Sequence, residues 1–223
     1  MRLERSLVAA LAVAAMAWPA GASAQAPSHD PILFIHGWNE NSAQWVNFIG
    51  RFTADGWSPS LLNTMNYKSA ESNKTIAEQV NQRVDQISAA NGGMKVDVIT
   101  HSMGGLSSRW YVKFLGGTEE VEDWVSLGGP NHGTFWASTP GCFTPASCRE
   151  MRIGSSFLDE LNAGDETPGT VRYGTWWSPC DEIIIPQEST ILEGAQNTKT
   201  ACIEHIQLSQ DGRVYEGVRD FVR

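Results

Sequence analysis

The sequence predicts an α/β fold in which a mostly parallel central sheet is flanked by helices on both faces. Short apolar runs alternate with segments whose apolar residues have helical spacing, and neither a repeat nor a low-complexity tract interrupts this order. Strands joined in sequence by helices pair in parallel and need helices on both faces of the sheet. The 223 residues, 41% hydrophobic and 18% charged, are enough for one domain with a sizeable core.

Residues 1–24 have the pattern of a secretory signal peptide. Two arginines precede an apolar run at 7–17, and the Ala-Ser-Ala at 22–24 is a small-residue cleavage signature. The alternative is a membrane anchor, but a membrane-spanning helix needs about twenty apolar residues, roughly twice the length of this run. We therefore expect a secreted protein, extracellular or periplasmic, with a linker at 25–30 and a single folded domain at 31–223.

The expected elements follow from hydrophobic patterns. The apolar run at 31–36 predicts a strand, and further strands are predicted at 96–100, 124–127 and 171–177. Apolar residues three and four apart predict helices at 43–55, 75–91, 104–115 and 214–222. Thr75 and Glu78 have the spacing of a capping box, and Gly92 follows the end of that helix. The segment 131–168 is rich in Gly, Pro, Ser and Thr, with one helix expected near 149–161, and such long excursions often shape binding sites.

The segment 100–105 has the sequence THSMGG and lies between a predicted strand and a predicted helix. In this context a G-x-S-x-G turn presents a serine hydroxyl above the sheet. Thr100 stands where that motif has its first glycine, whereas Gly104 and Gly105 leave room on the helix side. The alternative is that Ser102 only caps the helix, a position that serine favours. The strand–turn–helix context predicts that Ser102 is a nucleophile.

A serine nucleophile needs a histidine base within hydrogen-bond reach and an acid that orients the histidine. His29 follows no strand, and His101 lies too close in sequence to turn back onto the nucleophile. His36 and His132 follow strands and could line the site, but the usual chain order in such folds is nucleophile, acid, histidine. His205 comes late in the chain and is the predicted base.

Asp181 is the predicted acid. It lies just beyond the strand at 171–177, between Ser102 and His205 in the chain. The neighbouring Glu182 is its main rival, and an aspartate after a strand is often only a turn residue.

The four cysteines are interpreted as two disulfides rather than a metal site, because export would place them in an oxidising compartment. Four cysteines allow three pairings. A Cys142–Cys148 bridge would close a tight loop, and a Cys180–Cys202 bridge a longer one. The second bridge would hold the loop of the predicted acid against the loop of the predicted base. No metal is expected.

Two backbone amides are the predicted donors to an oxyanion. Met103 follows the nucleophile near a helix N-terminus, and Trp38 follows Gly37 after the first strand. Both would point at the carbonyl oxygen on which charge develops.

Side chains near the catalytic edge are expected to bind substrate, namely His36, His132, Phe135, Trp136 and Trp177. An acyl cleft is lined largely by apolar and aromatic side chains. The alternative for the tryptophans is the core, because one of Trp176 and Trp177 must point inward if their strand alternates.

Several blocks occur in a recognisable order: an apolar strand into His-Gly at 32–38, the THSMGG segment, VSLGGPNHGT at 125–134, and Asp181 followed by His205. Together they resemble the small secreted bacterial triacylglycerol lipases of the class 2 lipase family, which have the α/β-hydrolase fold. The resemblance covers essentially the whole chain after the signal peptide. It implies the triad and oxyanion amides named above, and cleavage of carboxylic esters of glycerol without a cofactor.

We therefore expect a monomeric serine ester hydrolase that forms an acyl-enzyme on a small-molecule or lipid ester, and the resemblance implies an acylglycerol. The net charge of −9 argues against a nucleic-acid partner, and no integral membrane span is expected. Three alternatives stay open: an acyltransferase or a polyester depolymerase with the same triad, and a non-catalytic binding protein with the same fold.

Overall fold

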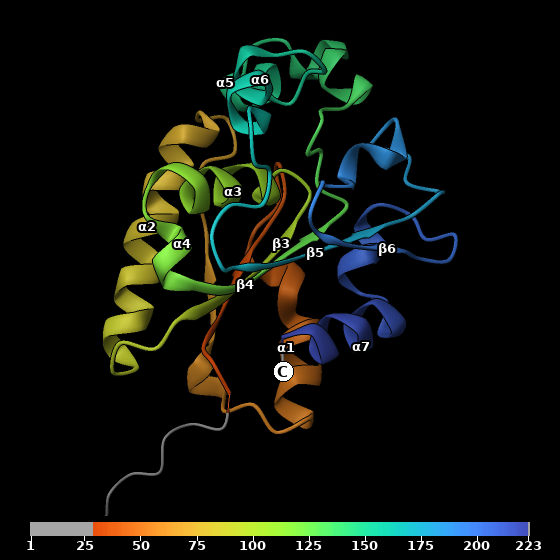
Figure 1. The fold of residues 1–223 in the computed structure, drawn as a ribbon. Coiled ribbons are helices and arrows are strands. Elements are labelled where there is room, and N and C mark those ends of the chain that lie inside the picture. The colour runs from red at the N-terminus through yellow and green to blue at the C-terminus, as the bar shows by residue number, and fades with distance from the viewer. Residues whose placement is uncertain (1–28, 223) are drawn as a thin grey trace, which may run out of the picture.

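The computed structural model describes residues 29–222, so the predicted signal peptide and most of the predicted linker lie outside the described residues. Within this range the chain forms a six-stranded sheet in the order β2-β1-β3-β4-β5-β6, and every neighbouring pair is parallel (Figure 1). The strands are β1 (Ile32–Ile35), β2 (Leu62–Met65), β3 (Val96–His101), β4 (Val121–Leu127), β5 (Arg172–Trp177) and β6 (Gln196–Lys199). The predicted α/β fold is confirmed.

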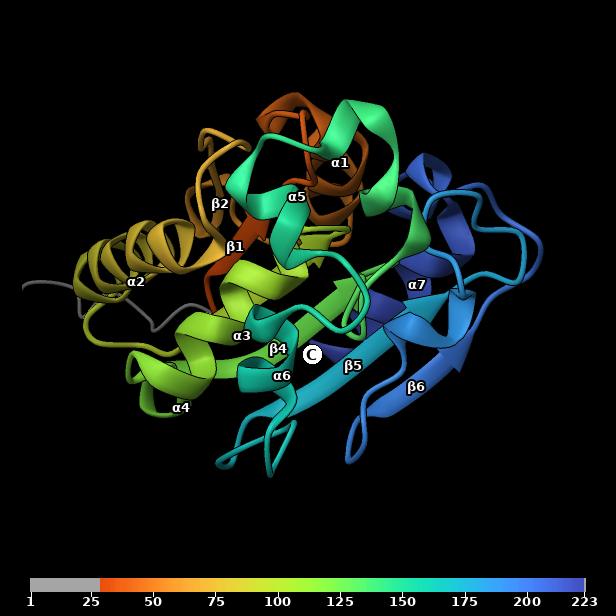
Figure 2. The same cartoon turned by 90° about the horizontal axis from the view of Figure 1, so that it is seen from above.

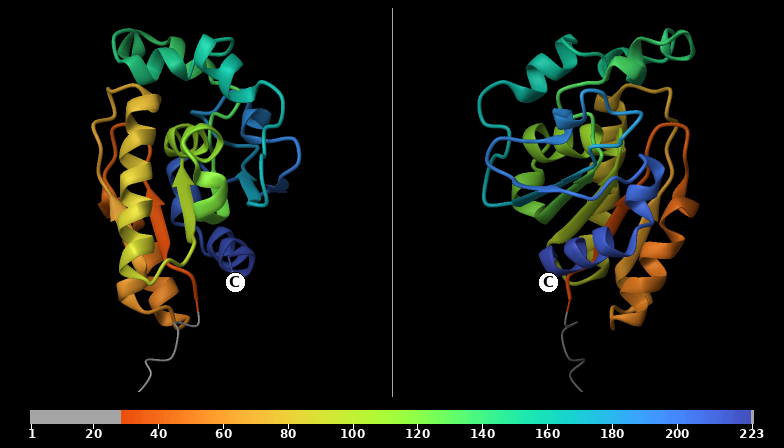
Figure 3. Two further views of the ribbon diagram at one scale, coloured as in Figure 1. Left: turned by 60° about the vertical axis from the view of Figure 1, so that its left-hand side comes forward. Right: turned by 90° about the vertical axis from the view of Figure 1, so that its right-hand side faces the viewer.

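Helices cover both faces of the sheet. They are α1 (Val46–Ala54), α2 (Asn73–Ala90), α3 (Gly104–Phe114), α4 (Gly117–Glu120), α5 (Ala146–Glu150), α6 (Ser156–Asn162) and α7 (Gly212–Phe221). α2 and α3 pack on one face, and α1 and α7 on the other (Figure 3).

The side chains of β1 show why both faces carry helices. Leu33 and Ile35 belong to the core under α2 and α3, whereas Ile32 and Phe34 belong to the core under α1 and α7. All four are fully buried. Alternate residues of a strand point to opposite faces, so a strand between two cores is a continuous apolar run.

The two edge strands have no counterpart among the predicted strands. β2 reads Leu-Asn-Thr-Met and is half-buried over most of its length, and β6 reads Gln-Asn-Thr-Lys and is mostly exposed. An edge strand pairs on one side and lies partly in solvent, so it need not have the apolar run that marks a central strand.

Two local predictions are wrong. α2 begins at Asn73, before the predicted capping box, because Ser72 caps it by accepting a hydrogen bond from the Lys74 amide at 3.2 Å. The single helix predicted near 149–161 is two helices, α5 and α6. Gly154 lies between them with a φ of 72°, in the left-handed region, which no residue of a right-handed helix adopts.

The excursion between β4 and β5, which carries α5 and α6, lies beyond the carboxyl ends of the strands. Figure 3 shows the strands pointing toward it, and in the view from above α5 lies in front of the sheet (Figure 2). A disulfide between Cys142 and Cys148 closes a short loop inside the excursion, and a second disulfide joins Cys180 to Cys202. Both predicted pairings are confirmed. Among the described helices, none has the length and apolar character needed to cross a bilayer.

Candidate active site

Ser102 lies in a sharp turn between β3 and α3, which we call the elbow (residues 100–105). Its φ is 53°, a strained value that lifts the hydroxyl away from the backbone. The elbow packs tightly, since a Cβ on Gly104 would lie 2.6 Å from the carbonyl oxygen of His36. The hydroxyl of Thr100, which stands in place of the first glycine of the motif, donates to the carbonyl of Val125 at 2.8 Å. The neighbouring strand therefore accommodates the threonine side chain.

The fold brings Asp181 and His205 together, with 2.8 Å between Oδ2 of the aspartate and Nδ1 of the histidine. Oδ1 of Asp181 accepts hydrogen bonds from the amides of Ile183 and Ile184, at 3.0 and 2.8 Å. Glu182, the rival acid, has a different contact: its carboxylate accepts a hydrogen bond from the backbone amide of His205 at 3.0 Å. The acid that touches the imidazole is therefore Asp181, and Glu182 holds the backbone behind it.

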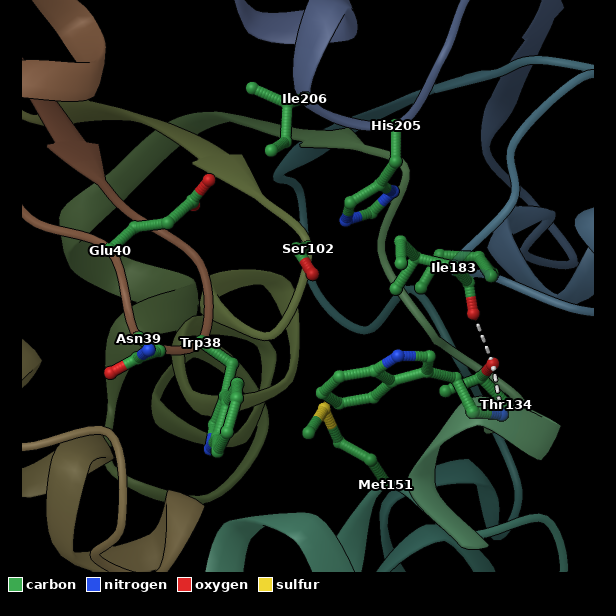
Figure 4. Close-up of a pocket in the computed structure, with 11 residues that line it drawn as sticks. Trp38, Asn39, Glu40, Ser102, Thr134, Met151, Ile183, His205 and Ile206 are labelled. Carbon is green, nitrogen blue, oxygen red and sulfur yellow. Dashed lines mark hydrogen bonds between the residues drawn. The ribbon is translucent and has the colours of Figure 1, made fainter. Parts of the chain in front are cut away.

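The ring of His205 is arranged to accept a proton. The carboxylate of Asp181 fixes the proton on Nδ1, which leaves the lone pair of Nε2 free. Burial lowers the pKa of His205 and the nearby His101 lowers it further, whereas Asp181 and Glu40 raise it. Figure 4 shows the imidazole pointing toward Ser102, and both side chains line the same cavity. A neutral imidazole facing a serine hydroxyl can act as a general base.

Gly128 packs against the hydrogen bond between Asp181 and His205. Its φ is 57°, and a Cβ at this position would lie 3.1 Å from Oδ2 of Asp181 and 3.2 Å from Nδ1 of His205. Glycine is the residue that fits both the backbone conformation and the space. The sequence identifies the segment that contains Gly128. It does not predict the contact, which forms only when the segments that follow β4 and β5 meet at the carboxyl edge of the sheet.

The loop that carries Asp181 and the loop that carries His205 are joined covalently. The Cys180–Cys202 disulfide links them directly. The hydroxyl oxygen of Ser178 adds a second link by accepting hydrogen bonds from the amides of Cys180 and Ile203, at 3.1 and 2.9 Å. These contacts restrict how far the two loops can move apart.

The two amides predicted as oxyanion donors lie next to the nucleophile. Trp38 lines the same cavity as Ser102, and Met103 follows Ser102 directly at the start of α3. In the hydrogen bonding of residues 29–222, neither amide donates to a protein acceptor. Both donors are therefore available to a bound group.

A cavity of about 250 Å³ opens at Ser102 and His205 (Figure 4). The other residues that line it are Trp38, Asn39, Glu40, Thr134, Trp136, Met151, Ile183, Ile184 and Ile206. The rings of Trp38 and Trp136 meet edge to face, with 5.3 Å between their centroids. A cavity with mostly apolar walls and a few polar groups at one place suits an apolar ligand with one reactive polar centre.

Comparison with known families agrees with this geometry. The model of the family described as lipase (class 2) matches residues 29–215. The chain belongs to the class 2 lipase family. This is a family of carboxylic ester hydrolases.

Individual relatives of this chain are distant. A triacylglycerol lipase of Burkholderia plantarii is 26% identical over 135 residues, which are 58% of this chain and 37% of that protein, so the chain spans little more than a third of that relative's length. The mature form of Bacillus licheniformis lipase BlEst2 has a TM-score of 0.76 at 16% identity, over 92% of this chain and 95% of that one. Aspergillus fumigatus lipase B has a TM-score of 0.67 at 21% identity, over 81% and 47%. The solved structures show a shared fold.

Of the five side chains predicted to bind substrate, Trp136 lines the cavity. His36 is buried behind the loop that follows β1, with its ring stacked on Tyr67 at 4.1 Å between centroids. His132 pairs with Glu166 at 2.7 Å, is partly exposed, and borders a separate hollow beside α6. Neither histidine reaches the wall of the cavity.

The other two predicted aromatic residues also lie outside the cavity wall. Phe135 is 64% exposed, because it points away from its neighbour Trp136 in the short 3-10 helix that they share. Trp177 is buried at the end of β5, with the ammonium group of Lys199 5.0 Å from its ring centroid. Neighbouring residues in these elements point in different directions, which their position at the catalytic edge does not reveal.

Several lining residues are absent from the predicted set. Ile183 and Ile184 follow the acid in the sequence, and Ile206 follows the base, so apolar residues directly after the predicted triad positions were the available signal. Met151 reaches the cavity from the excursion, and no local pattern marks it. Within residues 29–222, no group of three or more His, Cys, Asp or Glu side chains could hold a metal ion.

Proposed function

We propose that this chain is a secreted, monomeric serine ester hydrolase with one catalytic domain at 31–223, and that acylglycerols are its substrates. One observation carries the proposal: Ser102 and His205 lie together at a mostly apolar cavity, and Asp181 is hydrogen-bonded to the histidine. This arrangement activates a serine hydroxyl for attack on an ester carbonyl.

In the first half of the proposed reaction, Nε2 of His205 takes the hydroxyl proton of Ser102 while Oγ attacks the carbonyl carbon. The amides of Trp38 and Met103 stabilise the negative charge that develops on the carbonyl oxygen. Asp181 stabilises the imidazolium ion. The imidazolium then protonates the leaving alcohol, and the acyl group stays on the serine.

In the second half, a water molecule gives a proton to His205 and attacks the acyl-enzyme. The tetrahedral intermediate collapses, the carboxylic acid leaves, and the proton returns to Ser102. The chain's own residues supply every proton transfer in this cycle, so the reaction proceeds without a cofactor.

The cavity supports an acyl chain as the bound part of the substrate. Met151, Trp136 and the isoleucines after the acid provide apolar walls. Ile206 lines the cavity and is 51% exposed, so apolar surface continues from the cavity toward solvent. A long-chain ester would bury this surface on binding. The name of the Burkholderia plantarii relative, triacylglycerol lipase, supports acylglycerols as the natural esters.

Secretion is supported by the cysteines. All four form disulfides, and structural disulfides persist in oxidising compartments outside the cytosol. The predicted signal peptide agrees with this proposal.

Hydrolysis of p-nitrophenyl esters of increasing acyl length, with emulsified triacylglycerol and a polyester film beside them, tests the proposal. We expect the wild-type protein to hydrolyse the esters and Ser102→Ala to lose about 10⁶-fold in kcat. The exposed Ser60→Ala is the matched control and should keep wild-type activity. The acid limb of kcat/KM should lie below the ordinary histidine pKa of about 6.5, because burial lowers the pKa of His205.

Three outcomes would contradict parts of the proposal. Equal hydrolysis by Ser102→Ala and the wild type would refute the serine mechanism and favour a binding protein. Transfer to an added alcohol that outruns hydrolysis in dilute aqueous solution would favour an acyltransferase. Hydrolysis of the film, with none of the triacylglycerol, would favour a polyester depolymerase.

A further inference from the structure

A second histidine–carboxylate pair lies beside the proposed triad. His101 is fully buried in the elbow, and its Nδ1 lies 3.1 Å from Oε2 of Glu40. Its Nε2 lies 3.0 Å from the backbone carbonyl oxygen of His205. The rings of His101 and His205 are 4.6 Å apart between centroids. His101 therefore connects the nucleophile's own turn to two other catalytic segments.

The partners of His101 determine its protonation. A carbonyl oxygen only accepts hydrogen bonds, so Nε2 must carry a proton. Burial raises the pKa of Glu40, but the hydrogen bond and charge of His101 together with the Gly37 amide bring it below its ordinary value, so Glu40 is a carboxylate. A carboxylate also only accepts, so Nδ1 carries a proton too. With both nitrogens protonated, the ring of His101 is an imidazolium ion.

Glu40 extends the connection to the oxyanion loop (residues 36–40). Its Oε2 accepts a hydrogen bond from the amide of Gly37 at 2.9 Å, one residue before the proposed donor Trp38. A Cβ on Gly37 would lie 2.5 Å from Oε2 of Glu40 and 2.9 Å from Cβ of Ser102. Figure 4 shows Glu40 on the same loop as Trp38, beside Ser102. The oxyanion loop and the elbow thus meet at this carboxylate with no spare room.

We propose that the half-buried carboxylate of Glu40 and the buried imidazolium of His101 form a pair that positions the oxyanion loop, the elbow and the backbone of the catalytic base relative to one another. The role rests on the proposed function. Neither side chain takes part in bond making; both are positioning residues. The pair joins segments that are 61 and 104 residues apart in the chain. A small displacement of catalytic groups lowers the rate strongly, so loss of the pair would lower kcat more than it changes KM.

The charges of the pair also act on the base. The imidazolium of His101 lowers the pKa of His205, and the carboxylate of Glu40 raises it. The other titratable groups that face the pair are His36 directly after β1, Tyr67 after β2 and, through His205, Asp181. Removal of the imidazolium alone leaves the negative charge of Glu40 beside the base, so the acid limb of the kcat/KM profile would move to higher pH.

The test uses Glu40→Gln, His101→Gln and the double variant of the full secreted chain, with short-chain p-nitrophenyl esters. Each single variant is expected to lose about tenfold or more in kcat. The kcat of the double variant should be no lower than that of the less active single variant, because the two residues act as one unit. His101→Gln should also move the acid limb to higher pH. Glu160→Gln, which removes an exposed carboxylate paired with Lys74, is the control and should change neither quantity.

A second measurement does not depend on the folding of any variant. Nitrogen-15 NMR of histidine-labelled wild-type protein at pH 7 should show both ring nitrogens of His101 protonated. A neutral ring would overturn the proposal, as would folded single variants that keep kcat within about twofold of the wild type. Labelling of Ser102 by a phosphonate ester separates the two claims. If the wild-type protein neither hydrolyses esters nor becomes labelled, the proposed function is refuted and the positioning role with it. If the wild type is active and labelled but the variants are unaffected, the positioning role alone is refuted.

Discussion

The two ends of the sheet hold buried carboxylates in opposite ways. At the carboxyl ends of the strands, Asp181 accepts hydrogen bonds from two backbone amides and from His205. At the amino ends, Asp97 in β3 and Asp123 in β4 are equally buried. Within the described residues, both oxygens of Asp97 and Oδ1 of Asp123 lack a hydrogen-bond partner of good geometry.

Protonation follows this difference in partners. Burial and the nearby Asp123 raise the pKa of Asp97 well above its ordinary value, and the amide of Asp123 opposes the rise without cancelling it. Burial raises the pKa of Asp123 to about 6, although Arg172 lowers it. A buried carboxyl without donors favours its neutral form, whereas donors make burial compatible with a charge. The carboxyl ends of the strands therefore supply two backbone amides and an imidazole to one carboxylate, whereas at the amino ends Arg172 binds one oxygen of Asp123.

The largest expected effect comes from removing the charge of the proposed acid. Asp181→Asn keeps the shape of the side chain but favours the wrong tautomer of His205, so kcat should fall about 10⁴-fold. Glu182→Gln is the matched control, because glutamine can still accept the hydrogen bond from the backbone amide of His205. Its kcat should stay within about tenfold of the wild type. Ester hydrolysis measures both. An inactive Glu182→Gln beside a normal Asp181→Asn would show that the acid is Glu182.

A smaller loss of kcat is expected from Gly128→Ala, which disturbs the hydrogen-bond donors around the proposed acid without removing any of them. The added Cβ would press on Asp181 and His205 at a backbone conformation that alanine disfavours. We expect kcat to fall about 100-fold. Gly141→Ala, where a Cβ meets nothing within 4 Å, is the control and should behave as the wild type. Equal activities of the two variants would show that the contact does not constrain the triad.

The disulfide between the acid and base loops should matter more for stability than the disulfide in the excursion. Replacement of Cys180 and Cys202 by serine opens a link between residues 22 apart, whereas Cys142 and Cys148 are only 6 apart. The longer loop is worth about 3 kcal/mol of unfolding free energy, and the shorter loop less. Urea unfolding of the two double variants measures this. A larger loss for the Cys142 and Cys148 variant would contradict the expectation.

The smallest expected effect is a gain in stability when Asp97, at the amino ends of the strands, is replaced. Because the folded-state pKa of Asp97 is raised, its contribution to stability is full below the ordinary value of 3.8 and is lost as pH rises through the raised pKa. Asp97→Asn cannot ionise, so it should be more stable than the wild type at pH 8, by about 1 kcal/mol. The advantage should shrink toward pH 4. Thermal or urea unfolding across this range measures it, with the exposed Asp159→Asn as control. A wild type that is more stable than Asp97→Asn at pH 8 would refute the interpretation that ionisation of the buried Asp97 destabilises the fold.

Much of the fold and of the site could be predicted because the relevant patterns are local. β1 is a continuous apolar run, since both of its faces are covered, and the THSMGG elbow lies directly between a strand and a helix. The edge strands β2 and β6 escaped prediction because solvent replaces one of their neighbours. The walls of the cavity were predicted least well, since the direction of each side chain depends on loops packed from distant parts of the chain.

Local spacing in the sequence is enough to indicate a parallel α/β sheet, a serine at its carboxyl edge, and the acid and histidine that follow in the usual order. Spacing cannot show which loops meet. That depends on strand order: β3 lies between β1 and β4, so the elbow touches the oxyanion loop on one side and Gly128 lies near the acid on the other. The contact of Glu40 with His101 spans 61 residues and that of His101 with His205 spans 104, and neither leaves a periodic signal in the chain. Only the folded sheet brings these groups within hydrogen-bond distance.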